Sequence, residues 1–95
     1  MPNFTVRVEL HGADETDYEN LHEAMERKGF VRWIESNGGR YRLPTAEYNL
    51  LDAGMDKAKV LEIAKSTASS VKRSPSPWVL VTESAGRTWS DLERL

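Results

Sequence analysis

Apolar and polar side chains alternate over the first ten residues, which predicts a β-strand. The apolar positions are Phe4, Val6, Val8 and Leu10, and polar residues separate them. A period of two places one set of side chains on each face of a strand, so one face is expected to lie in a core. The segment His11-Gly12-Ala13 ends the alternation. The chain therefore opens with a half-buried strand.

The pattern then changes to helical spacing. Asp14 is a good N-cap residue, and acidic residues follow it in the first turn, where the helix dipole favours them. The stripe that would face the core consists of Tyr18, Leu21, His22, Met25 and Lys28. Gly29 can adopt the left-handed conformation that ends a helix. A helix is predicted over residues 15–28.

A hairpin is predicted next. Residues 30–35 are rich in β-branched and aromatic side chains, and the turn signal Ser36-Asn37-Gly38-Gly39 follows them. Residues 40–45 form the returning strand, with a continuation toward Tyr48. Pro44 has no N–H to donate, so it indicates an edge position or a bulge.

A second helix and a last strand complete the order of elements. Asp56 can cap a helix whose apolar stripe is Val60, Leu61, Ala64, Ala68 and Val71. Hydroxyl side chains weaken its final turns, and the segment 74–77 with two prolines ends it. Residues 78–82 read as an apolar strand, and residues 85–95 as a tail.

This order of strand, helix, strand, strand, helix, strand predicts an α+β fold. Two right-handed strand–helix–strand crossings joined by a hairpin make a ferredoxin-like βαββαβ sandwich. Its four-stranded antiparallel sheet would carry both helices on one face. We expect residues 1–84 to form this domain, with residues 85–95 as a C-terminal tail.

The other face of the sheet is predicted to be open and to mix arginines with apolar side chains. Arg7 and Glu9 fall on it from the first strand, and Arg32, Arg40 and Arg42 from the hairpin. The apolar residues left on it are Phe30, Ile34, Trp78 and Leu80. A mixed patch of this kind is typical of an interface. Two alternatives remain for what covers this face. It could be the chain's own tail, through Trp89, Leu92 and Leu95, or a second copy in a homodimer whose subunits could also exchange tails.

Composition restricts the class of protein. The 95 residues include no cysteine, which excludes disulfide scaffolds and thiolate chemistry. Neither an apolar run long enough for a membrane span nor a secretory signal pattern is visible, so a cytoplasmic protein is expected.

Charge is unevenly distributed within a net charge of −2. Residues 1–30 carry three basic and seven acidic side chains, a net −4, whereas residues 31–73 carry eight basic and five acidic, a net +3. A polyanion would thus be attracted to the hairpin and second helix. The alternative is that these charges only solvate helix faces, since nucleic-acid modules are usually basic overall.

Candidate catalytic groups are few. His11 follows the first strand and lies near Glu9, so this pair could act as a base on a ribose 2′-hydroxyl. His22 lies on the helix stripe and is expected at the boundary of the core. No resident cofactor is expected, although His11 with neighbouring carboxylates would also suit a divalent metal.

Five segments of the chain match a known sequence pattern: Asn3–Leu10, Asp17–Met25, Gly29-Phe30, Leu43–Tyr48 and Val79–Glu83. Through these segments the chain resembles the GhoS family of small bacterial proteins. The resemblance implies a ferredoxin-like fold related to small CRISPR-associated nucleases, which place an acidic residue at the end of the first strand, where Glu9 lies here. It also implies the activity of a type V antitoxin, an endoribonuclease that cleaves the messenger RNA of its toxin.

Two functions are therefore expected from the sequence. In the first, single-stranded RNA lies against Arg7, Arg32, Arg40 and Arg42, while Glu9 or His11 transfers the proton. In the second, the protein is a non-catalytic homodimeric interaction module that binds through the open face of its sheet.

Overall fold

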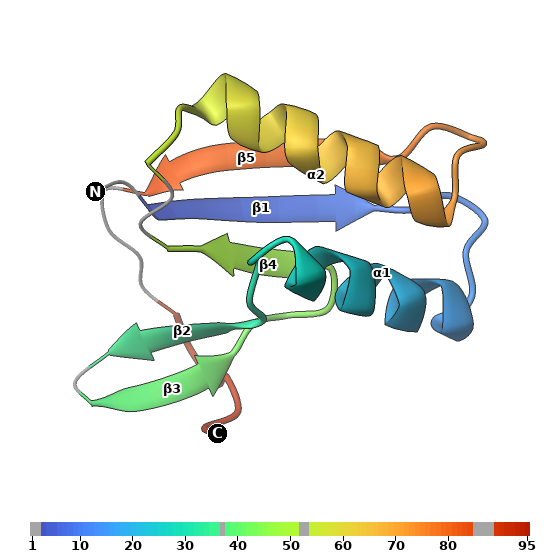
Figure 1. Cartoon of the computed structure of the whole chain (residues 1–95). Coiled ribbons are helices and arrows are strands. Elements are labelled where there is room, and N and C mark those ends of the chain that lie inside the picture. The colour runs from blue at the N-terminus through green and yellow to red at the C-terminus, as the bar shows by residue number, and fades with distance from the viewer. Residues whose placement is uncertain (1–2, 37, 52–53, 85–88) are drawn as a thin grey trace.

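The computed structural model describes residues 3–36, 38–51, 54–84 and 89–95, and these form an α+β fold (Figure 1). The elements in chain order are β1 (Asn3–Glu9), α1 (Glu15–Arg27), β2 (Trp33–Ser36), β3 (Gly39–Arg42), β4 (Glu47–Leu50), α2 (Lys57–Val71) and β5 (Trp78–Ser84). The predicted α+β class is confirmed, as are both predicted helices and the first strand.

The main sheet contains three antiparallel strands in the order β4-β1-β5. β1 is central, and Val6 lies opposite Tyr48 of β4 on one side and Val81 of β5 on the other. Phe4, Val6 and Val8 are fully buried. The alternation in the sequence thus assigns the inward face of β1 correctly.

β2 and β3 form a separate two-stranded hairpin below this sheet in Figure 1. Among the residues that the structure describes, the bridge between Val31 and Asn49 links the two parts: their backbones exchange N–H···O hydrogen bonds of 2.8 and 2.7 Å. The Asn49 side-chain amide also donates to the Trp33 carbonyl at 3.3 Å. The predicted four-stranded sheet is therefore not observed in the described residues, which form a three-stranded sheet and a separate hairpin.

Pro44 accounts for the interruption. The returning strand ends at Arg42, and a turn follows in which the Glu47 N–H donates to the Pro44 carbonyl at 3.1 Å. Ala46 in this turn has φ of 72°, a left-handed conformation that no strand contains. The chain changes direction here, so the predicted strand is divided into β3 and β4.

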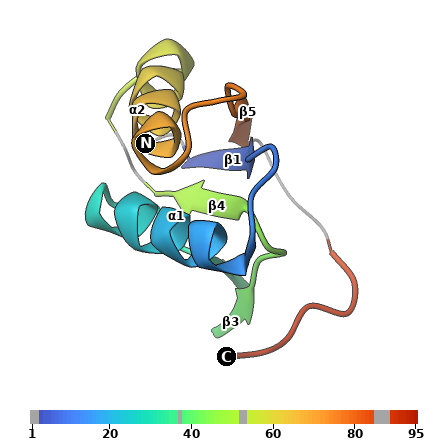
Figure 2. The same ribbon diagram turned by 90° about the vertical axis from the view of Figure 1, so that its right-hand side faces the viewer.

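Both helices cover the same face of the main sheet, as expected (Figure 2). In the described part of the chain, the core between the layers contains the buried residues Phe4, Val6, Val8, Leu10, Leu21, Met25, Phe30, Tyr48, Leu50, Val60, Ala64 and Ala68. The predicted placement of Phe30 and Ile34 on the open face is wrong, because their side chains are 0% and 3% exposed. Phe30 lies in the segment between α1 and β2, and Ile34 lies within β2, so a strict alternation from residue 30 onward does not describe them.

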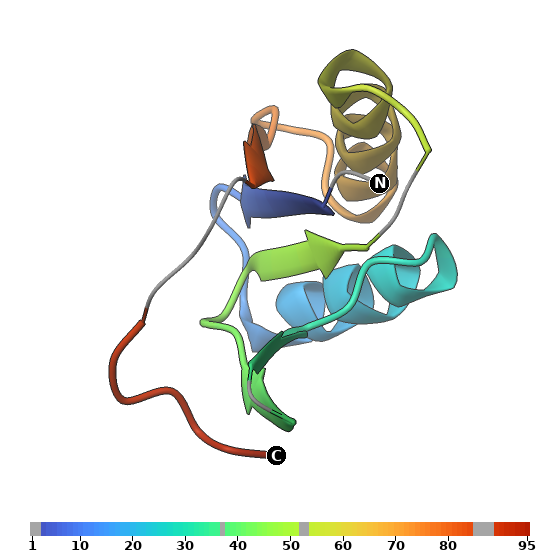
Figure 3. The ribbon, with the colours of Figure 1, turned by 90° about the vertical axis from the view of Figure 1, so that its left-hand side faces the viewer.

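The described part of the tail lies beside the hairpin. The Arg42 N–H donates to the Glu93 carbonyl, and the Leu95 N–H donates to the Arg40 carbonyl, both at 2.8 Å. The Trp89 ring packs against Tyr41 with centroids 5.5 Å apart. Figure 3 shows this segment on the side of the sheet away from the helices. It leaves Trp78 and Leu80 of β5 67% and 64% exposed, while residues 85–88 lie outside the described residues.

Within the described residues, no helix is both long enough and apolar enough to cross a membrane.

Candidate functional site

The proposed catalytic pair lies at the end of β1. Glu9 is the last residue of the strand, and its Oε2 is 3.9 Å from Nδ1 of His11. That separation exceeds a hydrogen bond, so the contact is electrostatic when the imidazole is protonated. The side chains are 46% and 25% exposed, respectively. The sequence spacing of two thus corresponds to proximity in space, and both side chains are partly exposed.

Trp78 adds an aromatic ring to this pair. It lies directly opposite Glu9 in the β1–β5 register, and its ring meets the imidazole of His11 edge-on at a centroid distance of 4.6 Å. Nε2 of His11 is buried and finds no hydrogen-bond partner within the described residues. The sequence had suggested Trp78 as an apolar contact only. Its proximity to His11 follows from the β1–β5 register, which the sequence does not specify.

Arg7 shares the open face with Glu9 but stands among opposite charges. It lies opposite Leu80 of β5 and Glu47 of β4. With Glu9 two residues along the same strand, one guanidinium faces two carboxylates. The main sheet alone therefore offers little net attraction for a polyanion.

The hairpin carries the stronger basic character. Arg40 and Arg42 lie on the same face of β3, two residues apart. In the paired strand, Trp33 lies opposite Arg42 and Glu35 lies opposite Arg40. The Arg40 guanidinium carbon lies 4.1 Å from the centroid of the Trp33 ring, and its Nε is 3.6 Å from Oε2 of Glu35. Arg42 is exposed. These contacts hold Arg40 in one orientation and leave Arg42 open to solvent.

Arg32 lies before β2 and is half-buried, with an Nε atom that has no hydrogen-bond partner within the described residues. With Trp33 and Arg42 it helps line a hollow of about 210 Å³. The structure therefore places Arg32 beside Arg42, although not on the strand face that carries Arg40.

His22 serves the core rather than the open face. Its Nδ1 is hydrogen-bonded to the hydroxyl of the buried Tyr48 at 2.6 Å. Burial and the positive charge of Arg32 lower the pKa of His22. Burial also raises the pKa of Tyr48. His22 thus occupies the boundary position that the helix stripe predicts.

The six predicted site residues consequently form two groups. Arg7 and Glu9 lie on the later part of β1, and His11 follows it. Arg32, Arg40 and Arg42 belong to the hairpin region, which extends to the lower left in Figure 1, whereas β1 ends at the right. In the part of the chain that the structure describes, no group of three or more histidine and carboxylate side chains is arranged to hold a metal ion.

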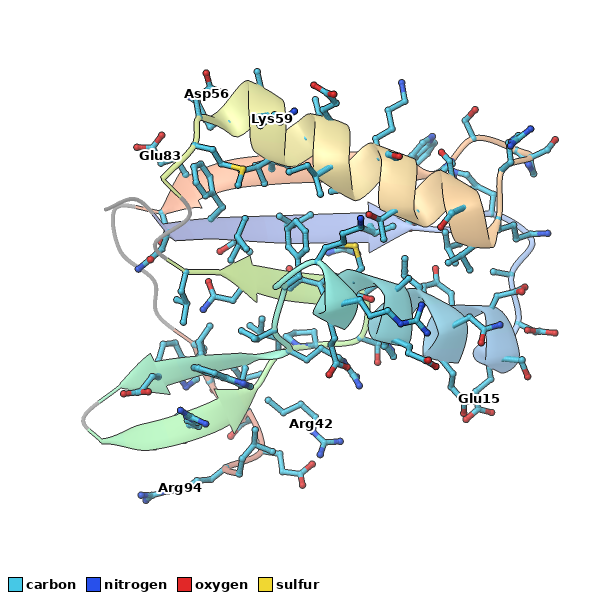
Figure 4. The ribbon with its side chains drawn as sticks, in the orientation of Figure 1. Glu15, Arg42, Asp56, Lys59, Glu83 and Arg94 are labelled. Atoms are coloured by element: carbon cyan, nitrogen blue, oxygen red, sulfur yellow. The ribbon has the colours of Figure 1, made fainter. Side chains whose placement is uncertain are left out.

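A further basic residue comes from the tail. Arg94 pairs with Tyr41 of β3 through a backbone bridge. In Figure 4 its side chain extends toward the hairpin tip, while that of Arg42 extends away from it. No local pattern marks this arginine as a site residue, because the pairing of the tail with β3 is a long-range contact.

Comparison of the chain with family models, with curated proteins and with solved structures gave no significant match.

Proposed function

We propose that this protein is an endoribonuclease that acts on single-stranded RNA, as its resemblance to the GhoS family suggests. The observation that supports this proposal best is the His11 imidazole beside Glu9 and the exposed Trp78 ring at the end of β1. By the same resemblance, the natural target would be a toxin messenger RNA. The proposal includes a ferredoxin-like fold whose sheet is interrupted. In it the hairpin would extend the strand order β5-β1-β4 at the Val31–Asn49 bridge, next to β4.

The chemistry assigned to the pair is proton transfer. Nδ1 of His11 accepts the proton of a ribose 2′-hydroxyl, because Nε2 is buried, and the 2′-oxygen attacks the adjacent phosphorus. The bond from phosphorus to the 5′-oxygen breaks, and that oxygen takes a proton from water. The hydroxide that remains takes the proton of the imidazolium, so the products are a 2′,3′-cyclic phosphate, a free 5′-hydroxyl and neutral His11. Glu9 stabilises the imidazolium that forms, because its carboxylate lies 3.9 Å from Nδ1. No step requires a metal.

The arginines position the substrate in this proposal. A strand bound along Arg42 and Arg40 would contact successive phosphates, because alternate residues of a strand lie about 6–7 Å apart. Replacing either arginine with Ala should weaken binding and reduce the salt dependence by about one unit of log–log slope. Cleavage of the saturated complex should change little.

The test is cleavage of an unstructured, end-labelled RNA, with and without EDTA. Wild type should cut the RNA in both conditions, and His11→Gln should slow cleavage by about 10²- to 10⁴-fold while RNA binding is preserved. His22→Gln is the matched control, since it removes the other imidazole and should leave the rate unchanged. RNA that stays intact at high wild-type concentration would refute the proposal.

A second candidate function rests on the exposed apolar patch. Trp78 and Leu80 are 67% and 64% exposed on one face of β5. An interaction module would bury them against another protein, and a homodimer would have twice the mass of 10.8 kDa in light scattering. Leu80→Glu should then return the mass to that of a monomer. A monomeric wild type would count against this alternative.

A further inference from the structure

A hollow at the hairpin joins residues from three segments of the chain. Its volume is about 580 Å³, and its lining includes Trp33 and Glu35 of β2, Arg40 of β3 and Arg94 of the tail. Gly38 and Gly39 close it at the turn. A hollow of this size can accept a single nucleotide. Its lining belongs to the hairpin and the tail, whereas the His11–Glu9 pair lies at the end of β1; β3 begins at the left of Figure 1 and β1 ends at its right.

Trp33 and Arg40 are stacked on each other in the hollow. Arg40 lies over the Trp33 ring at 4.1 Å, and Glu35 is 3.6 Å from its Nε. Guanidinium planes and aromatic rings are the surfaces on which proteins stack unpaired bases. The Trp33–Arg40 stack therefore presents both kinds of surface to a nucleobase.

Arg94 supplies the second positive charge. The backbone bonds of Glu93 and Leu95 to β3, each 2.8 Å, fix the tail on either side of it. A Cβ atom added at Gly39 would lie 3.3 Å from the Arg94 guanidinium, so this group lies close against the backbone of the turn. Two arginines face one carboxylate in the hollow, which favours a phosphate ligand.

We infer that this hollow binds one nucleotide of a single-stranded RNA, with the base on the Trp33–Arg40 stack and a phosphate between Arg40 and Arg94. The inference rests on the RNA-binding half of the proposed function. It assigns the tail a role in substrate binding, since the tail contributes Arg94.

The test uses a fluorescent 2′-O-methyl RNA octamer, which lacks the attacking hydroxyl and stays intact. Arg94→Ala should weaken its binding several-fold and lower the salt slope by about one. Trp33→Ala should weaken binding by roughly 5- to 150-fold. Trp33→Phe keeps an aromatic ring, and it is the variant to use should the Ala variant not fold; it should bind RNA with reduced quenching of tryptophan fluorescence.

Arg73→Ala is the matched control, because it removes one exposed arginine from the segment that follows α2. It should bind the octamer as wild type does. Wild-type affinity and salt slope in Arg94→Ala, with full quenching in Trp33→Phe, would overturn the inference even if the enzyme cleaves RNA. Arg94-dependent binding without cleavage of ordinary RNA would support the inference and refute the nuclease proposal. An octamer that wild type does not bind would overturn the inference and favour the protein-interaction alternative.

Discussion

Single residues at the core boundary show how burial decides what a histidine does. His11 and His22 both directly follow a leucine, yet His22 is hydrogen-bonded to buried Tyr48 whereas His11 contacts exposed Trp78. The hydrogen bond between His22 and the buried hydroxyl of Tyr48 gives the imidazole of His22 a structural role. The imidazole of His11 contacts an exposed ring instead, so it is not restrained in this way.

The lowered pKa of His22 makes folding sensitive to pH. Its folded pKa lies below the ordinary value of 6.5, so the unfolded chain binds more protons as the pH falls through that value. Stability contributed by neutral His22 is therefore complete above about pH 7.5 and is lost between there and the folded pKa. Urea denaturation of wild type and His22→Gln at pH 7.5 and 5.5 checks this. The wild type should lose more stability than the variant, and equal losses would contradict the expectation.

The helices show which local signals were sufficient at the scale of an element. Asp14 accepts from the Asp17 N–H at 2.9 Å, and the Asp17 side chain accepts from the Asp14 N–H at 3.1 Å, which is a capping box. Asp56 caps α2 in the predicted way by accepting from the Lys59 N–H at 2.9 Å. These caps were predictable because they depend on residues within four positions of each other.

The hydroxyl-rich end of α2 is more regular than its composition suggests. The Thr67 hydroxyl donates to the Ile63 carbonyl at 2.8 Å, and the Ser70 hydroxyl donates to the Thr67 carbonyl at 2.6 Å. Both groups thus bond to their own helix, and α2 continues to Val71.

Removing the cap of α1 should measurably destabilise the protein. Asp14→Ala leaves the Asp17 N–H without its acceptor and should lower the free energy of unfolding by about 1 kcal/mol. Asp14→Asn is the matched control, because asparagine caps helices nearly as well. Urea denaturation at pH 7.5 measures both variants. An Ala variant as stable as the Asn variant would show that the capping box contributes nothing.

At the scale of the whole molecule, the hairpin separates from the main sheet and makes its own contacts. It pairs with the tail along β3 and touches the main sheet through Val31 and Asn49. The basic hairpin and the His11–Glu9 pair are consequently held apart by the fold. An RNA that reaches both must be several nucleotides long.

The inward position of Phe30 gives a stability test of this arrangement. Phe30→Ala removes a fully buried ring and should lower the free energy of unfolding by about 3–5 kcal/mol. Leu80→Ala, at a side chain that is 64% exposed, should change it by less than about 0.5 kcal/mol. Thermal and urea denaturation measure both. A similar small effect in the two variants would mean that Phe30 lies on the surface after all.

The sequence by itself determined the two helices, their caps, the inward face of β1 and the turn at Gly38, whose φ is +78°. Each of these depends on side chains and backbone conformations within a few residues, which a local pattern records. Only the tertiary structure decided that the hairpin leaves the sheet after Pro44, that Phe30 and Ile34 turn inward, and that the tail pairs with β3. It also decided that Trp78 meets His11 and that Arg94 joins Arg40. These outcomes depend on strand register and on contacts between segments far apart in the chain, and no local pattern encodes them.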